Sequence, residues 1–565
     1  MISPRRKLPP VSRPRIIAAL FIVVGLFLVG RLVQLQILQH DQWTTYATSI
    51  QEVTIELAPQ RGTIVDRNGL ALAEDIKAMA IAVDSYNMTR PETLIGILED
   101  NLPLRASELR DLVYRASYFT WIDRSVDLDV ALRIREAAAE AGVYGLIFFD
   151  TWKRSYPQGT LASNILGFVG TDGGGLEGIE LAFDEWLTGE PTVMQFVTGA
   201  DGRTYQSTMV SQGRPGHDLV LSIDAVIQLA CEEEIDRGAD RFQANFGMML
   251  MMDPNTGSIL AMAQSRRYDP NRFADSTAED RRNLAVTHLF EPGSSFKAFS
   301  AAAALDAGTV DLDDQFDGRD GFVVGGHTIH NADFESFGQV TLAEIIESSI
   351  NTGMVQVALD LGAEALHATL VELGFGCDTG IELPGEEEGI LRDPDQWVPL
   401  DLASASIGQS IAVTAVQLIA AMSSIANGGM HLPCSIVETD TSEAPTSEPR
   451  EALSASTCAT MRSLLLRVVE SGTGQWAKVP GYQVAGKTGT AQKAVGGQGY
   501  VEGLYTSLFA GFVPVLDPQL VALVVFDEVQ SGPVGGGYTA GQVFSSAMSR
   551  IVQLERVPPA SAGGA

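Results

Sequence analysis

The chain has 565 residues, 45% of them hydrophobic, which is enough for several domains with apolar cores and excludes a disordered protein. Its 70 acidic residues against 38 basic ones give a formal charge of −32. The phosphate backbone of a nucleic acid would repel a chain this acidic, which excludes nucleic acid as a partner.

The N-terminal residues predict a membrane anchor. Basic residues crowd positions 1–15, and an apolar stretch with one arginine follows over positions 16–38. Its length suits one transmembrane helix, and the basic flank predicts a cytoplasmic tail. A cleaved signal peptide is the alternative, but no small-x-small cleavage site follows the stretch. We therefore expect a single-pass membrane protein whose remaining residues lie outside the cytoplasm.

Residues 39–215 predict a separate α+β domain without a nucleophile motif. Short alternating strands are interspersed with loops such as 171–175 and with a helix over 126–141. We interpret this part of the chain as a pedestal that holds the next domain away from the membrane.

Residues 216–555 predict a second α+β domain. A hairpin over 246–252 and 258–262 opens it, and three strands, over 482–491, 505–513 and 520–526, precede a last helix over 542–554. Strands at both ends of the domain with helices between them predict an antiparallel sheet flanked by helices. The remaining residues, 556–565, are expected to be disordered.

The run Glu291-Pro-Gly-Ser-Ser-Phe-Lys297 predicts a nucleophile beside its base. A turn leads into an Ala-rich helix that Gly308 ends, and a spacing of three places Ser294 and Lys297 on one helix face. Ser295 is the alternative nucleophile, but its spacing of two turns it away from the lysine. At a helix N-terminus, free N–H groups favour the negative charge of acyl transfer.

Two further motifs follow along the chain. Ser349 and Asn351 lie in a polar loop between apolar helical runs, and Ser348 lacks the Ser-x-Asn spacing. The run Lys487-Thr-Gly-Thr490 follows alternating apolar residues and predicts an exposed strand edge, where Gly489 permits close backbone approach. Such an edge can pair with an extended peptide.

Ser-x-x-Lys, Ser-x-Asn and Lys-Thr-Gly in this order form the motif set of penicillin-binding proteins and serine β-lactamases. Nearly the whole chain resembles class B penicillin-binding proteins, which are monofunctional peptidoglycan D,D-transpeptidases. The resemblance extends to Arg61-Gly-Thr-Ile-Val-Asp-Arg-Asn-Gly69, Gly175-Leu-Glu-Gly-Ile-Glu180, Gly472-Thr-Gly474 and Gly486-Lys-Thr-Gly-Thr-Ala-Gln-Lys493. It implies a β-lactamase-like catalytic domain, an elongated pedestal of the dimerisation type before it, and a location in the bacterial inner membrane. Phe183-Asp-Glu-Trp-Leu-Thr-Gly189 and the lack of a C-terminal repeat extension resemble the septal, cell-division branch; an elongation enzyme is the alternative.

The resemblance assigns roles to these residues. Ser294 would be the nucleophile and Lys297 its base, which burial and the neighbouring Lys487 keep uncharged. Ser349 would relay protons, and Asn351 would orient Lys297 and the substrate amide. Thr488, Gly489 and Thr490 would bind the substrate, and the N–H groups of Ser294 and Thr490 would form an oxyanion hole. No cofactor and no metal are expected.

The resemblance also implies the reaction and its partners. Ser294 would attack the penultimate D-Ala of a peptidoglycan stem peptide, and a neighbouring stem's amine would capture the acyl-enzyme. β-Lactam antibiotics would trap the serine. Glu386, Glu387 and Glu388 match a structural turn of the family, so deacylation should be slow. A glycan-polymerising enzyme and other division-complex membrane proteins are the expected partners. A β-lactam sensor and a division scaffold are the remaining alternatives.

Two smaller clusters of residues are further candidate sites. His327, His330 and Asp333 could bind a metal, but an offset of three sends strand side chains to opposite faces, and we favour a polar hairpin near the substrate cleft. Cys434 and Cys458 flank a polar loop, and a disulfide across its base is possible. The remaining cysteines, Cys231 and Cys377, are expected to be buried singly.

Overall fold

The structure is a computed structural model that describes residues 13–43, 52–115, 119–198, 204–438, 448–495 and 499–559. Most of the predicted cytoplasmic tail and the last six residues lie outside this part. Two compact units form. The first comprises Met1–Pro59, Lys77–Trp152 and Glu190–Pro215, and the second comprises Gln60–Ile76, Lys153–Gly189 and Gly216–Ala565. The second unit thus includes two segments from within the predicted pedestal, and the predicted domain limits stay predictions.

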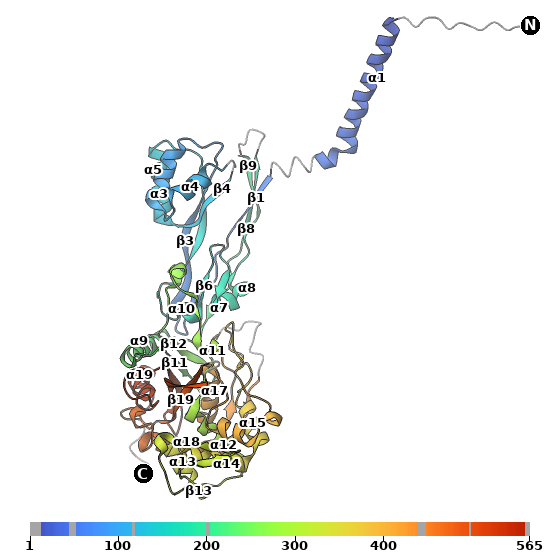
Figure 1. The fold of residues 1–565 in the computed structure, drawn as a ribbon. Coiled ribbons are helices and arrows are strands. Elements are labelled where there is room, and N and C mark those ends of the chain that lie inside the picture. Colours follow the sequence, from blue (N-terminus) through green and yellow to red (C-terminus); the bar gives the residue numbers. More distant parts are fainter. Residues whose placement is uncertain are drawn as a thin grey trace, which may run out of the picture. The chain divides into compact units, whose positions relative to one another are not determined.

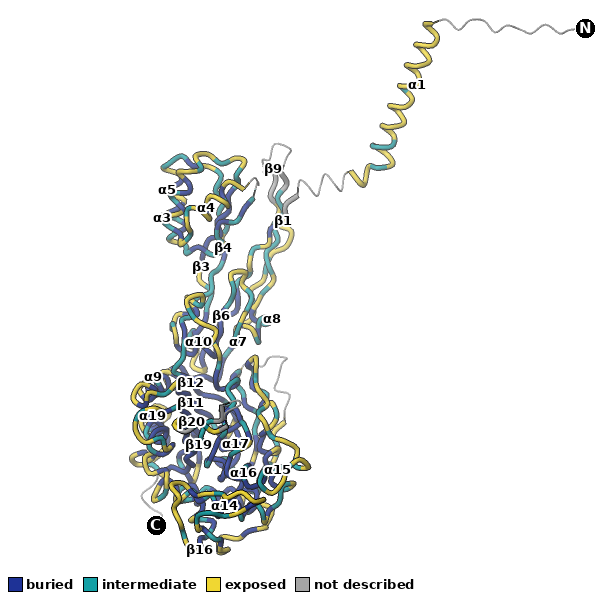
Figure 2. Tube along the Cα trace, viewed as in Figure 1, coloured by how far each residue is buried: buried dark blue, intermediate teal, exposed yellow. Residues whose placement is uncertain are grey.

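The N-terminal helix has the properties of a membrane span. Helix α1 (Arg13–Val33) continues into a short π-helical turn, η1 (Gln34–Leu38). Together they have 26 residues with a mean hydropathy of 2.7 over their most apolar part. Their side chains are mostly exposed (Figure 2). An isolated helix with this apolar surface would be unstable in water, and its length suffices to cross a bilayer.

Besides α1 and η1, the described part of the first unit contains strands of two β-structures and three further helices. Strands β1 (Glu52–Leu57), β8 (Thr192–Thr198) and β9 (Thr204–Ser211) form an antiparallel sheet in the order β1-β8-β9. Strand β3 (Ala71–Val83) pairs with β4 (Thr120–Asp127) and β5 (Leu146–Ser155), and helices α3 (Pro91–Asn101), α4 (Ala106–Val113) and α5 (Leu128–Glu140) enclose an apolar core with them. The predicted helix over 126–141 is therefore confirmed.

A five-stranded antiparallel sheet is the centre of the second unit (Figure 1). Its order is β12-β11-β21-β20-β19, with β11 (Phe246–Met252), β12 (Ile259–Gln264), β19 (Ala485–Val495), β20 (Gly499–Val513) and β21 (Leu520–Asp527). Strands from both ends of the unit lie side by side, so the predicted sheet is confirmed. Strand β19 is at the edge, where its outer backbone groups have no neighbouring strand.

Alternate residues of β11 enter two separate apolar cores, as the period of a strand requires. Met248 and Leu250 pack into the larger core, which includes helix α17 (Ala415–Ala426), whereas Met249 packs into the smaller one. The smaller core contains α9 (Ala225–Phe242) and α19 (Ala540–Leu554). Both faces of the sheet are thus covered, which explains why every residue of β11 is buried.

The remaining elements of the second unit surround this sheet. The elements before the Ser294 turn are β2 (Ile64–Val65), α6 (Ser163–Leu166), β6 (Phe168–Val169), β7 (Gly175–Glu177), α7 (Gly178–Ala182), α8 (Asp184–Leu187), β10 (Leu219–Val220), η2 (Pro270–Asp275), α10 (Ala278–Arg281) and α11 (Leu284–Thr287). From that turn onward they are η3 (Gly293–Phe296), α12 (Lys297–Asp306), β13 (Phe316–Asp317), β14 (Phe322–Val324), β15 (His327–Ile329), η4 (Ala332–Phe334), β16 (Gln339–Val340), α13 (Leu342–Ser348), α14 (Asn351–Leu361), α15 (Ala363–Glu372), η5 (Pro394–Gln396), α16 (Pro399–Ser406), β17 (Met430–His431), β18 (Arg450–Glu451), α18 (Ala455–Glu470) and η6 (Gln475–Ala477).

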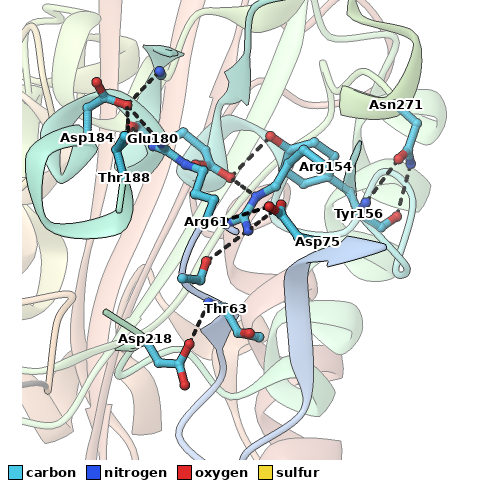
Figure 3. A network of polar contacts seen from close by, with 12 residues as sticks. Arg61, Thr63, Asp75, Arg154, Tyr156, Glu180, Asp184, Thr188, Asp218 and Asn271 are labelled. Carbon is cyan, nitrogen blue, oxygen red and sulfur yellow. Dashed lines mark hydrogen bonds and ion pairs between the residues drawn. The ribbon is translucent and has the colours of Figure 1, made fainter. Parts of the chain in front are cut away.

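A buried ion network joins the two early segments of the second unit (Figure 3). Glu180 is fully buried and accepts hydrogen bonds from Arg61 Nε at 2.6 Å and Arg154 Nε at 2.7 Å. Arg154 also pairs with Asp75 at 3.2 Å, and Asp75 Oδ2 accepts the backbone N–H of Arg61 at 2.7 Å. Two of the motifs that carried the family resemblance, those containing Arg61 and Glu180, therefore meet in one structural cluster.

The four cysteines all lie in the described part of the chain, and all are free. The disulfide that we considered between Cys434 and Cys458 is therefore absent from this structure, and each thiol is buried separately. The prediction that Cys377 is buried is wrong, because its side chain is only half-buried, with Sγ 3.6 Å from the Gly374 carbonyl oxygen.

Candidate active site

The turn that carries Ser294 depends on its glycine. Gly293 has a φ of 54°, and a Cβ atom there would lie only 2.8 Å from the Thr490 carbonyl oxygen. A side chain would therefore be strained and would push the turn away from β19. Ser294 lies in the 3₁₀ turn η3, and Lys297 is the first residue of α12. The predicted helix after the serine is thus confirmed.

Lys297 is at the centre of a closed hydrogen-bond cluster. Its side chain is fully buried, and Nζ lies 2.6 Å from both the Ser349 carbonyl oxygen and Asn351 Oδ1. Ser294 Oγ is 3.1 Å away, and Ser349 Oγ is 3.2 Å away. The carbonyl and amide oxygens can only accept, so they take the two N–H groups of a neutral amine. Its lone pair is then left for a hydroxyl proton.

Burial controls the charge of this lysine. Loss of solvation lowers the pKa of Lys297 well below its ordinary value, and the charge of Lys487 lowers it further. Lys487 is also fully buried, and loss of solvation lowers its pKa to about 7. Burial and the neighbouring lysine therefore favour the uncharged form of Lys297, which is the form that a general base requires.

Ser349 and Asn351 lie at the junction of two helices. Ser349 is the left-handed cap of α13, with a φ of 58°, and Asn351 begins α14. This sharp turn directs the Ser349 carbonyl and hydroxyl toward Lys297. Asn351 Nδ2 donates to the His330 carbonyl at 2.7 Å, which fixes Oδ1 toward the lysine.

The hydroxyl of the neighbouring Ser295 is bonded to a group outside the cluster. Ser295 is fully buried, and its hydroxyl donates to the Pro292 carbonyl at 2.8 Å. Ser294 is only half-buried and contacts Lys297. The structure therefore gives Ser294, and not Ser295, the position of a nucleophile.

Strand β19 supplies the other part of the site. Lys487 Nζ donates to Ser349 Oγ at 2.9 Å, which links the edge strand to the α13–α14 turn. Thr488 and Thr490 are two residues apart and so point to the same face of the strand. Thr490 Oγ1 accepts the Gly536 N–H at 3.0 Å, so its own proton can be donated to a ligand. A Cβ atom at Gly489 would lie 2.7 Å from the Pro292 carbonyl oxygen, which explains the glycine.

Two contacts have no counterpart in the sequence-based prediction of the site. The Thr473 hydroxyl lies 2.8 Å from that of Thr488 and adds a third hydroxyl beside β19. Tyr500 on β20 donates to Glu291, at 3.1 Å from Oε1, just before the Ser294 turn. The only sequence signal for Thr473 was the Gly472-Thr-Gly474 motif. Nothing in the sequence linked Tyr500 to Glu291, because their contact joins side chains that are distant along the chain.

The predicted polar hairpin lies next to the site. Strands β14 and β15 pair as a hairpin, and His330 follows β15. Its Nδ1 pairs with Asp320 Oδ2 at 2.9 Å, while its carbonyl accepts the Asn351 amide. His327 and Asp333 are exposed. Within the described residues, no group of three His, Cys, Asp or Glu side chains is arranged to hold a metal ion.

Comparisons with known proteins agree with this geometry. The family described as "Penicillin binding protein transpeptidase domain" matches residues 247–549, and the family described as "Penicillin-binding Protein dimerisation domain" matches residues 56–221. A curated protein of Pseudomonas aeruginosa, named "Probable peptidoglycan D,D-transpeptidase PbpC", is 32% identical over 96% of this chain and 95% of its own length. "Peptidoglycan D,D-transpeptidase FtsI" of Escherichia coli is 29% identical over 94% of this chain and 90% of its own length.

Solved structures show the same fold. A peptidoglycan synthetase from Bifidobacterium adolescentis is similar with a TM-score of 0.72 and 26% identity, covering 91% of this chain and 99% of that one. Penicillin-binding protein 3 of Mycobacterium tuberculosis, complexed with aztreonam, is similar with a TM-score of 0.69 and 27% identity, covering 89% of this chain and 98% of that one.

Proposed function

This chain belongs to the penicillin-binding protein transpeptidase family, and from that premise we propose that it is a serine D,D-transpeptidase that cross-links peptidoglycan stem peptides. One observation carries the proposal: a buried amine with a depressed pKa has both N–H groups occupied by carbonyl-type acceptors while a serine hydroxyl lies 3.1 Å away. The amine can therefore only accept that hydroxyl's proton.

The first half-reaction transfers the acyl group to the enzyme. Lys297 takes the Ser294 proton as Oγ attacks the carbonyl of the penultimate D-Ala, and an oxyanion forms. The N–H groups of Ser294 and Thr490 stabilise that charge. The same proton then passes to the departing D-Ala nitrogen, through Ser349, which lies between Lys297 and Lys487. Asn351 holds Lys297 in place, and the hydroxyls of Thr488 and Thr490 bind the substrate carboxylate and backbone.

A β-lactam carries a strained amide and a carboxylate and acylates Ser294 by the same route. Glu386 is held by Thr379, with its carboxylate accepting the Thr379 N–H at 2.9 Å, so it is part of a structural turn. We propose that the site has no carboxylate that activates water and that the penicilloyl-enzyme persists. Rapid penicillin turnover would contradict this.

The direct test is a pair of serine variants treated with a fluorescent penicillin. Ser294→Ala should abolish covalent labelling. Ser295→Ala should retain it, although the unpaired Pro292 carbonyl should cost about 1–3 kcal/mol of stability. Peptide mapping should find the label on Ser294. Labelling of the Ser294→Ala protein would refute the proposal.

We further propose a single-pass location in the inner membrane, with residues 16–38 as the anchor, residues 1–15 in the cytoplasm and the catalytic unit outside. The proposed domains are a pedestal over 39–215 and a transpeptidase domain over 216–555. The Phe183–Gly189 resemblance supports a septal role, with a glycan polymerase and division proteins as partners in the membrane. Location along the side wall instead of the division site would favour the elongation alternative.

A further inference from the structure

The proposed reaction produces one proton that the Ser294 cluster cannot take up. The attacking amine of the acceptor stem peptide arrives as a primary ammonium, because such groups have pKa values near 10.4. Of its three N–H protons, one remains on the new amide nitrogen and one returns to Ser294 Oγ through Lys297. The third must leave before the attack, because an ammonium has no lone pair. Lys297 accepts only the second of these protons in each transfer.

We propose that His330, oriented by Asp320, is the general base that removes this proton from the acceptor ammonium. This inference rests on the proposed function and assigns the residue that serves its second half-reaction. His330 is connected to the Ser294 cluster through its own backbone, since its carbonyl accepts Asn351 Nδ2 at 2.7 Å and Asn351 Oδ1 contacts Lys297. The backbone of His330 is therefore linked to the Lys297 amine through one side chain, that of Asn351.

The imidazole is arranged as a base. Nδ1 lies 2.9 Å from Asp320 Oδ2, which holds the proton on Nδ1 and leaves Nε2 as an acceptor. Within the described part of the chain Nε2 has no hydrogen-bond partner, and 47% of the side chain is exposed. Nε2 is thus open to a ligand, whereas the amine of Lys297 is buried.

The segment around His330 is held rigidly, as a positioned base requires. Asp320 Oδ1 accepts the Asn331 N–H at 2.7 Å, so one carboxylate fixes both the ring and the backbone. Asn331 is buried, and its Oδ1 accepts the Thr352 N–H at 3.0 Å in the first turn of α14. The hairpin end and the helix that begins with Asn351 therefore form one connected structure.

The charge around this hairpin suits a cationic acceptor. Between positions 311 and 335 the chain has seven carboxylates and one basic residue, Arg319, which is paired with Asp317. Asp320 is the titratable group that contacts the His330 ring, Asp333 and Glu335 follow His330 within five positions along the chain, and Lys297 contacts Asn351. This excess of negative charge attracts an ammonium group and repels a second anion.

In the proton balance, Nε2 takes one proton from the ammonium and passes it to water, and the amine lone pair then attacks the Ser294 ester. The C–Oγ bond breaks as the C–N bond forms. Lys297 carries the second N–H proton to Ser294 Oγ. No oxidant, metal or further reactant is required.

The test measures how the acyl-enzyme divides between aminolysis and hydrolysis. The full-length protein is acylated by a thioester donor, N-benzoyl-D-alanyl-thioglycolate, with Nα-acetyl-lysine as the amine, and the ratio of amide to acid product is followed from pH 6 to pH 10.5. Both products form from the same acyl-enzyme, so a change in the acylation rate does not alter their ratio. His330→Gln should lower it at least tenfold at pH 7.5.

The pH dependence distinguishes a base from a structural residue. The His330→Gln protein should approach the wild-type ratio near pH 10.5, where about half of the acceptor amine is already free. In the Asp320→Asn protein the ratio of amide to acid product should fall nearly as much at pH 7.5, because an amide N–H facing Nδ1 forces the proton onto Nε2. His327→Gln, the same change in the same hairpin, should leave the ratio unchanged.

An unchanged ratio for His330→Gln at pH 7.5, or the same loss at every pH, would overturn the inference while leaving the proposed function intact. The proposed function fails separately if the wild-type protein forms no acyl-enzyme with donor or penicillin.

Discussion

At the scale of single residues, the site depends on keeping two lysines out of water. Lys297 and Lys487 are both fully buried, and within the described residues their hydrogen-bond partners are hydroxyls, carbonyls and an amide, not carboxylates. A carboxylate partner would restore their charge and remove the base. Burying these two amines therefore lowers the stability of the fold while it makes Lys297 a base. The acylation rate and the unfolding free energy should show these two effects.

The rate of acylation should follow the neutral form of Lys297. Because burial and Lys487 lower its pKa well below the ordinary value, the second-order rate constant for a penicillin should rise with pH and level off well below pH 10.4. An unperturbed lysine would give a rise centred near pH 10.4. Stopped-flow labelling from pH 5 to pH 10.5 measures this, and a midpoint near 10.4 would contradict the assigned base.

Removing the Lys487 charge should stabilise the protein at neutral pH. Its folded pKa of about 7 is below its unfolded value, so the unfolded state binds more protons between about pH 7 and pH 10.4, and stability rises with pH across that range. Lys487→Met should therefore raise the unfolding free energy at pH 7 by a few kcal/mol, on the order of the proton linkage, and lose this advantage above about pH 10.4.

Urea unfolding at several pH values measures that effect. Lys478→Met is the matched control, because Lys478 is exposed and donates to the Glu470 carbonyl. Its stability relative to the wild type should not vary with pH. Equal pH curves for the wild type and Lys487→Met would show that the Lys487 amine is not desolvated as described.

At the scale of elements, close backbone approach sets the spacing between the nucleophile's turn and the edge strand. A methyl group on Gly489 would lie 2.7 Å from both the Pro292 carbonyl oxygen and Leu508 Cγ. Gly489→Ala should therefore displace η3 from β19 and lower the acylation rate at least tenfold, because sub-ångström misplacement is costly in catalysis. Gly338→Ala, where a methyl group meets nothing within 4 Å, should acylate normally.

The ion network around Glu180 should be essential to the second unit. Glu180→Gln would leave two buried guanidinium groups without their shared carboxylate, which should cost about 3–5 kcal/mol. The exposed pair of Arg214 and Glu190, 3.7 Å apart, gives the control: Glu190→Gln should cost at most about 1 kcal/mol. Similar losses in thermal unfolding for the two variants would contradict the buried role.

Several helices and strands could be predicted from the sequence, whereas two contacts at the site could not. Local patterns were sufficient for β11, β20, β21 and α19, because apolar periodicity and turn residues are local properties. The spacing in Ser294–Lys297 and Ser349–Asn351 gave the residues that the structure brings together. The Thr473–Thr488 and Tyr500–Glu291 contacts could not be predicted, since they arise where strands and turns distant in sequence meet.

At the scale of the whole molecule, charge and hydropathy are separated along the chain. The formal charge of −32 keeps the extended surface solvated, whereas Arg13–Leu38 is almost uncharged and exposes its apolar side chains. These two properties have different consequences. The first predicts a soluble catalytic part, and the second predicts that this part is attached to a membrane through one helix.

Removing residues 1–43 should therefore release a soluble protein that still reacts with penicillin. The Ser294 cluster draws its contacts from residues 293–536, all within the second unit, so the labelling rate should stay within about twofold of the full chain, since distant, uncoupled changes contribute little.

The full chain should stay with the membrane after alkaline carbonate washing. In spheroplasts, added protease should digest the catalytic unit from outside, because a basic N-terminal flank is retained in the cytoplasm. Protection of that unit until the membrane is permeabilised would reverse the proposed orientation, and carbonate extraction of the full chain would exclude the anchor.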